Sequence, residues 1–458
     1  MSATPRDGLA EVVADLDARA EEHLEELAQY VAIPSVSAEN SGVREAAQHI
    51  TERAQAWGFE TTILETRGQP AVVAHGPRVA DRPHVLIYGH YDVQPAGART
   101  TWATDPFITT IRDGRIFGRG TADNKGQHLA HLLAMRSWLR LTDTLPMNVT
   151  MLLDGEEEVG SPNLPNLVHT HRDLFDCDLV VWSDGPVHES GRATINFGVR
   201  GIVAFDLTAR GADVDLHSGN WGGVAPSPAW ELVHLLATMR DRNGWLTVSG
   251  LTSDIRPPSP AETAALDALP VPTDELTALG INRLDGPPGR TFYERLAAHP
   301  TLSINALDTG SSGSDRAVIP AYARARCDVR LVDAMGVQST FECLRAHVAR
   351  HAPDVRCTLV AGMEPSRTDP DTVWTAPIAR ALQAVHGVEP LLVPAMGGSL
   401  PDYVFTKILG VPSLGVPFAN ADESNHAPNE NIELHRYLQA PQIAATLLAE
   451  LAAAAGES

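Results

Sequence analysis

The sequence predicts an α/β fold in which a mostly parallel sheet forms one domain and an α+β domain is inserted into it. In the first part of the chain, and again from about residue 374, continuous apolar segments alternate with helical stretches. This pattern is typical of parallel strands that helices cover on both faces. Between these parts the segments alternate between apolar and polar residues, and a proline-rich loop occupies residues 256–275. We therefore expect one domain to comprise residues 1–196 and 374–458, and the inserted domain to comprise residues 197–373.

The first domain opens with helical periodicity and continues with buried strands. Apolar residues from Leu9 to Val31 recur at helical spacing, which predicts one amphipathic helix that ends before Pro34. A second helix is predicted at 128–139. Three apolar segments are predicted as strands: HVLIY (84–88), VTMLL (149–153) and LVVW (179–182).

The inserted domain and the end of the chain show different patterns. Residues 227–240 are predicted as a helix, and the alternation in 321–332 is that of an edge-forming strand. Later the sequence predicts a helix at 376–386 and a strand at 391–394. The last apolar segment runs into a polar stretch, ANADESNHAPNEN (419–431).

The composition excludes several classes of function. The chain has 458 residues, with 57 Asp and Glu against 35 Lys and Arg, and a formal net charge of −22. Such a surface repels nucleic acid and anionic membranes, so neither is expected as a partner. No apolar run approaches the ~18 residues that a membrane span needs. The acidic N-terminal segment does not resemble a secretory signal, and the four cysteines form no CxxC pair. We therefore expect a cytoplasmic protein.

Polar clusters follow the carboxyl ends of the predicted strands. These ends meet at one edge of a parallel sheet, where open α/β sheets bind their ligands. Two imidazoles with several carboxylates and no thiolate suit zinc, manganese or cobalt. So many carboxylates would repel one another strongly without bound cations, and their number indicates two ions that share a bridging carboxylate. The candidates are His90, Asp92, Asp123, Glu156, Glu157, Glu158, Asp184 and His426.

Competing catalytic motifs are absent from the sequence. There is no HExxH, GRGTADNKG (118–126) lacks the spacing of a phosphate loop, and GGSLP (397–401) is not a nucleophile elbow. These absences disfavour a zincin, a nucleotide-dependent enzyme and a serine hydrolase.

The ordered motifs resemble those of M20-type metallopeptidases, and most closely the dimeric dipeptidase branch that includes carnosinase-like and cytosolic non-specific dipeptidase-like enzymes. The similarity covers nearly the whole chain, including the inserted domain, which in this family is a lid and dimerisation domain. The motifs are GHYDVQP (89–95), GRGTADNKGQ (118–127), DGEEEVGSPNL (154–164), WSDGP (182–186), DLHSG (215–219), PTLSIN (300–305), AVIP (317–320) and NHAPNE (425–430).

The resemblance implies a role for each candidate of the metal site. One divalent ion would be held by His90 and Asp184, and the other by Glu158 and His426. Asp123 would bridge both ions, and zinc is the first candidate for each. Asp92 would orient His90 through its second ring nitrogen. Glu157 would be the general base that takes a proton from water and returns it to the leaving amine. Glu156 is left without a role, and the Asp123–Asn124 peptide bond is expected to be cis.

The resemblance also implies residues that contact the substrate. His217 would reach the active site from the partner subunit and stabilise the oxyanion, so a homodimer is expected. Arg330 would bind a substrate carboxylate, and the same pocket would include Asn305, Gly397, Gly398 and Ser399. The family usually has an arginine where this chain has Ala395, which leaves the substrate open.

The sequence leaves three functions open. The first is a two-metal dipeptidase, and the second is an N-acyl-amino-acid amidohydrolase that uses the same metals. The third is an inactive binding protein, which would have lost a ligand or the base, although none is missing here. Lys125, one of only two lysines with Lys407, follows the bridging aspartate by two positions and suggests a packing or charge role.

Overall fold

The computed structural model describes residues 6–310 and 316–455 and contains an eight-stranded mixed sheet. Its central pairs β6–β3, β3–β7 and β7–β16 are parallel, as is the edge pair β8–β15, while β1–β2, β2–β6 and β16–β8 are antiparallel. In spatial order the strands are β1 (Glu60–Leu64), β2 (Ala71–His75), β6 (Asn148–Asp154), β3 (His84–His90), β7 (Leu179–Trp182), β16 (Ser413–Gly415), β8 (Thr194–Asn196) and β15 (Leu391–Val393).

Helices cover both faces of this sheet because side chains alternate along its central strands. Val85 and Ile87 of β3 pack into one apolar core, whereas Leu86 and Tyr88 pack into another on the opposite face. The first core is completed by α1 (Leu9–Ala18), α2 (Ala20–Val31), α3 (Val43–Ala56), α4 (Lys125–Thr142), α12 (Thr375–His386) and α13 (Leu434–Ala455). The second is completed by α5 (Leu164–Thr170) and the π-helical turn η5 (Val404–Leu409).

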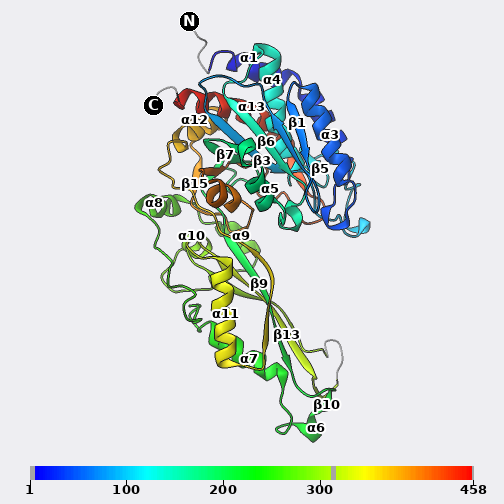
Figure 1. Cartoon of the computed structure of the whole chain (residues 1–458), viewed down its shortest axis with the longest axis vertical. Coiled ribbons are helices and arrows are strands. Elements are labelled where there is room, and N and C mark those ends of the chain that lie inside the picture. The colour runs from blue at the N-terminus through cyan, green and yellow to red at the C-terminus, as the bar shows by residue number, and fades with distance from the viewer. Residues whose placement is uncertain (1–5, 311–315, 456–458) are drawn as a thin grey trace.

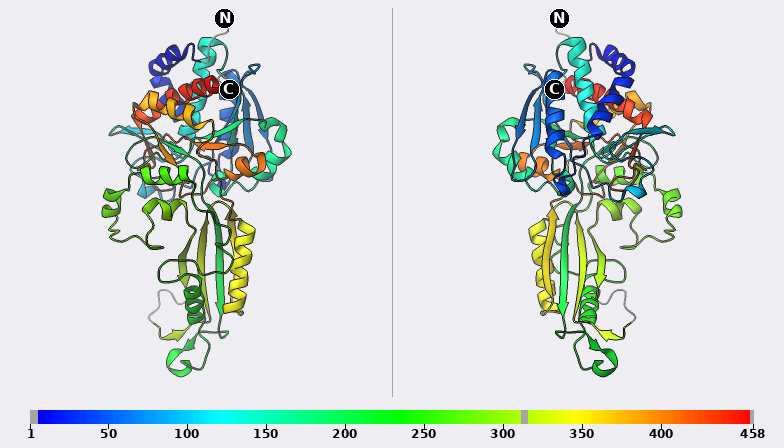
Figure 2. Two further views of the ribbon diagram at one scale, coloured as in Figure 1. Left: turned by 90° about the vertical axis from the view of Figure 1, so that its left-hand side faces the viewer. Right: turned by 90° about the vertical axis from the view of Figure 1, so that its right-hand side faces the viewer.

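A second, antiparallel sheet forms an elongated lobe below the first (Figures 1 and 2). Its spatial order is β11 (Thr301–Asp308), β13 (Tyr322–Leu331), β9 (Gly201–Arg210) and β14 (Arg356–Met363). Alternate residues of β13, such as Cys327 and Val329, pack under α7 (Pro228–Met239) and α11 (Val337–His351). We call the elements from β9 to β14, with α6 to α11, the inserted lobe.

Short elements complete the two parts. In the inserted lobe they are α6 (Ser218–Trp221), α8 (Pro260–Ala268), α9 (Thr273–Ala278), α10 (Phe292–Ala297) and the pair β10 (Leu216–His217) and β12 (Val318–Ile319). Beside the large sheet, β17 (Asn431–Glu433), β5 (Arg115–Phe117) and β4 (Thr110–Arg112) form a three-stranded sheet. Among the described helices, none is both long and apolar enough to cross a membrane.

The predicted fold class is confirmed, with three local corrections. The strand predicted at 321–332 is not at an edge, because β13 lies between β11 and β9. The proline-rich stretch 256–275 is not all loop, because it contains α8 and the start of α9. The chain leaves the large sheet after β8, builds the inserted lobe and returns with α12 and β15, which pairs with β8. The exact boundaries at 196/197 and 373/374 stay a prediction. The single N-terminal helix was wrong: the helix breaks at Arg19, whose backbone (φ −108°, ψ 18°) is not helical and whose N–H bonds back to Leu16 and Asp17.

Candidate metal centre

The candidate ligands come from five places at the carboxyl edge of the large sheet. His90 ends β3, Asp184 follows β7, and Glu158 lies in the short 3-10 helix η3 (Glu157–Val159) after β6. Asp123 immediately precedes α4, and its peptide bond to Asn124 is cis, as expected. His426 lies in the loop between β16 and β17 with a left-handed backbone (φ 55°).

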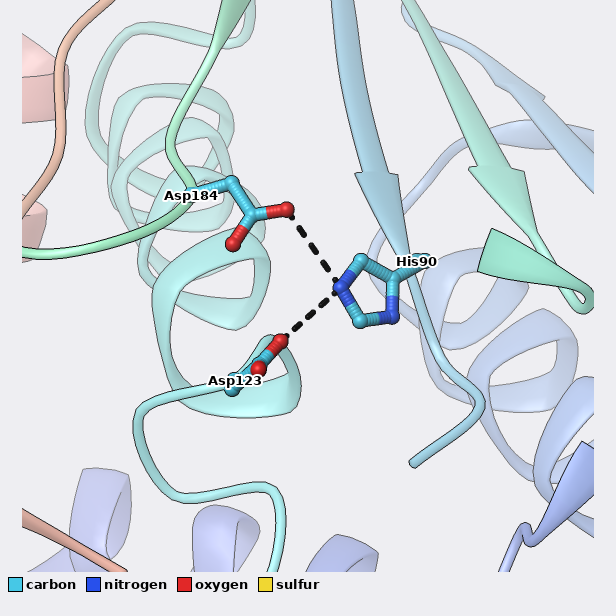
Figure 3. A group of neighbouring side chains, drawn as sticks. All are labelled: His90, Asp123 and Asp184. Carbon is cyan, nitrogen blue, oxygen red and sulfur yellow. Dashed lines mark ion pairs between the residues drawn. The ribbon is translucent and has the colours of Figure 1, made fainter. Parts of the chain in front are cut away.

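One group of potential ligands consists of His90, Asp123 and Asp184, all buried (Figure 3). The Nε2 atom of His90 lies 3.1 Å from Asp123 Oδ1 and 3.4 Å from Asp184 Oδ2. This nitrogen has no hydrogen bond of good geometry among the described residues, although it is completely buried. A buried imidazole nitrogen that faces two carboxylates in this way fits a divalent cation between them.

A second group consists of Asp123, Glu158 and His426. The Nε2 atom of His426 lies 3.1 Å from Asp123 Oδ2 and 3.1 Å from Glu158 Oε2. Asp123 therefore presents one carboxylate oxygen to each imidazole. In both groups, the candidate ligand atoms lie within 4.8 Å of one another. The donors are nitrogen and oxygen only, which suits zinc, manganese or cobalt.

The charges of the site are unbalanced without cations. Burial alone would lower the pKa of His90, but Asp123 and Asp184 outweigh it and raise that pKa well above its usual range. Asp123 and Glu158 raise the pKa of His426 to about 10. These raised pKa values favour the protonated form of both imidazoles, so metal binding would release protons.

Glu157 lies beside the first group, with Oε2 4.0 Å from His90 Nε2. Burial raises the pKa of Glu157 well above its usual range, and the charges of Asp184, Glu158 and Asp123 raise it further against the opposing effect of His90. A carboxylate with a raised pKa near a reacting water is suited to accept and return a proton.

The contacts of Asp92 differ in detail from the expected hydrogen bond between its carboxylate and His90. His90 Nδ1 lies 3.0 Å from the backbone oxygen of Asp92 and 3.4 Å from its carboxylate. The carboxylate oxygens instead accept the backbone N–H groups of Glu157 and Glu158, both at 3.1 Å. Asp92 therefore connects the end of β3 to the turn that carries the candidate base and ligand.

Three further residues hold the site together and were missed in the sequence. Asn124 accepts the backbone N–H of His90 (3.3 Å) and donates to the carbonyl of Ser183 (2.6 Å), so it joins the ends of β3 and β7. Glu430 Oε1 accepts three backbone N–H groups of the loop that carries Asp123, those of residues 120, 122 and 123. Gln94 donates from Nε2 to Glu158 Oε2 at 2.9 Å. Each lies inside one of the motifs that resemble the M20 family, and the sequence contains no other indication of its role.

The structure also places two residues whose roles were left open. Lys125 is fully buried, and its Nζ donates to the carbonyls of Tyr30 (3.1 Å) and Ile33 (2.6 Å). It therefore fastens the start of α4 to the end of α2. Glu156 points away from the centre, where its carboxylate accepts from Asn163 Nδ2 at 2.7 Å.

Among the candidate substrate residues, Arg330 and Ser399 connect the inserted lobe to the first domain, whereas Asn305 contacts only its own lobe in the hydrogen bonds of the described residues. Arg330 donates to Ser399 Oγ at 2.9 Å, which joins β13 to the loop with Gly397 and Gly398. This loop lies beside the metal ligands, because a Cβ on Gly185 would meet Met396 at 3.2 Å. Asn305 donates to Asp328 at 2.6 Å.

His217 is not part of the cluster within one chain. It ends β10, at the tip of the inserted lobe far from the large sheet (Figure 1). Its ring is exposed, and Nδ1 accepts the backbone N–H of Gly219 at 3.1 Å. Any contact between His217 and a metal centre would therefore involve another chain or a large movement of the lobe.

A mostly parallel α/β sheet with imidazole and carboxylate groups at its carboxyl edge, and with an inserted lobe, is the architecture of a metal-dependent hydrolase. The chain belongs to peptidase family M20/M25/M40, whose family model matches residues 86–450. The resemblance seen in the motifs is thereby confirmed.

Relatives cover almost the full length of the chain. The chain is 30% identical to a Cys-Gly metallodipeptidase of Schizosaccharomyces pombe, over 97% of this chain and 98% of that protein. It is 28% identical to the Beta-Ala-His dipeptidase of Homo sapiens, over 84% of this chain and 78% of that protein. Among solved structures, an M20 family metallo-carboxypeptidase from Sulfolobus solfataricus superposes with a TM-score of 0.88 at 28% identity, over 94% of this chain and 99% of that one.

Proposed function

We propose that this protein is a two-metal dipeptidase that hydrolyses the amide bond of dipeptides or similar small peptides. One observation carries the proposal: the two oxygens of Asp123 lie 3.1 Å from His90 Nε2 and from His426 Nε2, respectively. A carboxylate that presents one oxygen to each of two candidate metal sites is suited to bridge the two ions of a two-metal hydrolase. The names of the relatives, Cys-Gly metallodipeptidase and Beta-Ala-His dipeptidase, support a dipeptide substrate.

Each residue of the centre then has a chemical role. His90 and Asp184 would hold one divalent ion, and Glu158 and His426 the other, with Asp123 shared; zinc is the first candidate. When bound, the two ions would lower the pKa of a water molecule and polarise the substrate carbonyl. The chain supplies the proton transfer: Glu157 would take a proton from the water and give it to the leaving amine.

The substrate would lie between the centre and the inserted lobe. Arg330, which already donates to Ser399, would bind the free carboxylate of the peptide through a charge-assisted hydrogen bond. The backbone of Gly397 and Gly398 and the side chain of Asn305 would line the same pocket.

We also propose that the active unit is a homodimer and that residues 197–373 form a lid and dimerisation domain. The exposed position of His217 at the tip of the lobe supports this, because a partner chain could bring it to the oxyanion. A reducing compartment such as the cytoplasm is further supported by the four cysteines, Cys177, Cys327, Cys343 and Cys357, which are all free.

A hydrolysis panel tests the proposed function. Protein stripped with a chelator and reloaded with zinc, manganese or cobalt would be assayed on dipeptides and on N-acyl amino acids. We expect metal-dependent release of amino acids from dipeptides. Hydrolysis of N-acyl amino acids alone would indicate an N-acyl-amino-acid amidohydrolase instead. That alternative stays open because Ala395 stands where the family usually has an arginine.

A further inference from the structure

A cavity of ≈ 370 Å³ opens in the inserted lobe, between the 240–244 loop, α10 and the start of β11. α10 lies at the end of the lobe that is nearest the large sheet (Figure 1). The volume lies at the lower end of the ~300–1,000 Å³ typical of small-molecule sites. It is therefore large enough for an amino-acid side chain, and none of the candidate metal ligands lines it.

The wall of this cavity is positively charged. Arg200, Arg240 and Arg295 line it against a single carboxylate, Asp285. In a chain with 57 acidic and 35 basic residues, such an excess of guanidinium groups differs from the average surface. Burial lowers the pKa of His299, the remaining titratable group of the wall, so its ring is neutral at pH 7.

The guanidinium groups are only partly satisfied by the protein. Arg200 is 4% exposed, and its Nε atom has no hydrogen-bond partner among the described residues. Arg240 donates to Asp285 at 2.5 Å, and Arg295 donates to the backbone carbonyls of Arg290 and Asp285. A buried donor without an acceptor is destabilising, so this wall is suited to receive an anionic acceptor.

The cavity shares its wall with the proposed carboxylate site. Thr301 lines the cavity and stands directly opposite Arg330 in the β11–β13 pair, so their side chains lie on one face. Arg200 donates to Thr301 Oγ1 at 2.7 Å. Burial, with a contribution from the neighbouring Arg330, lowers the pKa of Arg200 to about 10.

The substrate loop adjoins the same wall from the other side. Leu296 lines the cavity, and a Cβ on Gly397 would meet its Cδ1 at 3.0 Å. A peptide whose carboxylate is bound by Arg330 beside Ser399 would therefore place its C-terminal side chain next to the cavity.

We propose that this cavity receives the side chain of the C-terminal residue of the dipeptide and selects acidic side chains, those of aspartate and glutamate. The proposal rests on the proposed function, since it extends the carboxylate site of Arg330. An aliphatic or aromatic side chain would supply no acceptor for Arg200 Nε and no charge to balance the excess of guanidinium groups, and a basic one would be repelled by them. The pocket would thus determine specificity without taking part in bond cleavage.

Two peptides of equal size test the proposal on the metal-loaded enzyme, Ala-Glu and Ala-Gln. We expect kcat/KM for Ala-Glu to exceed that for Ala-Gln by about tenfold or more, as for a hydrogen bond to a charged group. In Arg295→Met and in Arg240→Met the ratio should fall towards one, mainly through loss of Ala-Glu turnover. Arg290→Met is the matched control, because Arg290 lies on the same segment, pairs with Glu294 at 3.2 Å and does not line the cavity; its ratio should stay that of the wild type.

Equal kcat/KM values for the two peptides in the wild type, or a ratio that survives both arginine substitutions, would overturn the proposal while leaving the dipeptidase function intact. If neither peptide is cleaved, the dipeptide panel decides on the proposed function, and calorimetric binding of free glutamate and glutamine to the metal-loaded protein decides on the acidic pocket. Preference for glutamate that is lost in Arg295→Met and Arg240→Met would support the acidic pocket, and equal or absent binding would refute it.

Discussion

The carboxylate of Asp92 accepts the backbone N–H of Glu157 at 3.1 Å and, through its other oxygen, that of Glu158 at the same distance. Its own backbone oxygen lies 3.0 Å from His90 Nδ1. One buried aspartate therefore fixes a candidate ligand from β3 relative to the candidate base and ligand that follow β6. Outer groups of this kind orient the metal ligands, and their loss weakens metal binding.

Replacing Asp92 with Asn should weaken metal binding. The amide can accept only one of the two N–H groups, and its NH2 would face the other. We expect the affinity for zinc to fall by about 10–100-fold, the usual effect of losing such a partner. Competition with a chelator measures this, and Asp422→Asn, which alters an exposed pair with Arg115, is the control. Unchanged affinity in Asp92→Asn would show that the turn holds its shape without the carboxylate.

Replacing Glu157 with Gln should abolish proton transfer but retain the metals. We expect kcat to fall by about 10²–10⁴-fold, the range for a general base, with unchanged metal content. Glu156→Gln is a matched control on the neighbouring residue, because Gln keeps an acceptor for Asn163 and Glu156 points away from the centre. Near-wild-type kcat in Glu157→Gln would mean that another group accepts the proton.

Mixing two inactive variants tests whether His217 acts across a dimer. A heterodimer of His217→Ala and Glu157→Gln chains has one complete site, composed of Glu157 from one chain and His217 from the other. With free exchange of subunits at equal amounts, about a quarter of wild-type activity should return. Activity that stays at the level of the separate variants would indicate that His217 acts within its own chain or not at all.

The stability of the metal-free protein should fall in mild acid, partly because of His131. Burial lowers the pKa of His131 to about 3, whereas an unfolded histidine titrates near ~6.5. Below that pH the unfolded chain takes up a proton that the folded chain does not, so the free energy of unfolding decreases as the pH falls towards 3, by at most ~1.4 kcal/mol per pH unit.

His131→Gln removes this titration and keeps an N–H donor for Ser183 Oγ, which lies 2.8 Å from His131 Nε2. Urea unfolding of both proteins between pH 4 and pH 6.5, in the presence of a chelator, should show a shallower slope for the variant. Parallel slopes would mean that the His131 ring gains its proton in the folded state.

Much of the centre could be predicted from the chain because strand ends are visible in the sequence. Parallel strands converge at one edge, so polar residues after 84–88, 149–153 and 179–182 had to lie close together, and the structure brings His90, Glu158 and Asp184 to that edge. The choice of Glu157 over its neighbours came from the resemblance alone and is still a prediction.

What could not be predicted depends on contacts with the backbone. Asn124 and Glu430 bind N–H and C=O groups of distant segments, and periodicity contains no information about such partners. The break at Arg19 was hidden because the apolar spacing continues through it. The partners of Lys125, two carbonyls at the end of α2, could not be predicted either. Only the rarity of lysine in this chain indicated that Lys125 has a specific role.

The metal content of the purified protein tests the central claim most directly. Elemental analysis of zinc-reloaded protein should give two ions per chain, and anomalous scattering should place one beside His90 and Asp184 and the other beside Glu158 and His426, with Asp123 between them. At most one ion per chain, or ions bound away from Asp123, together with peptide hydrolysis that a chelator does not abolish, would contradict the two-metal account.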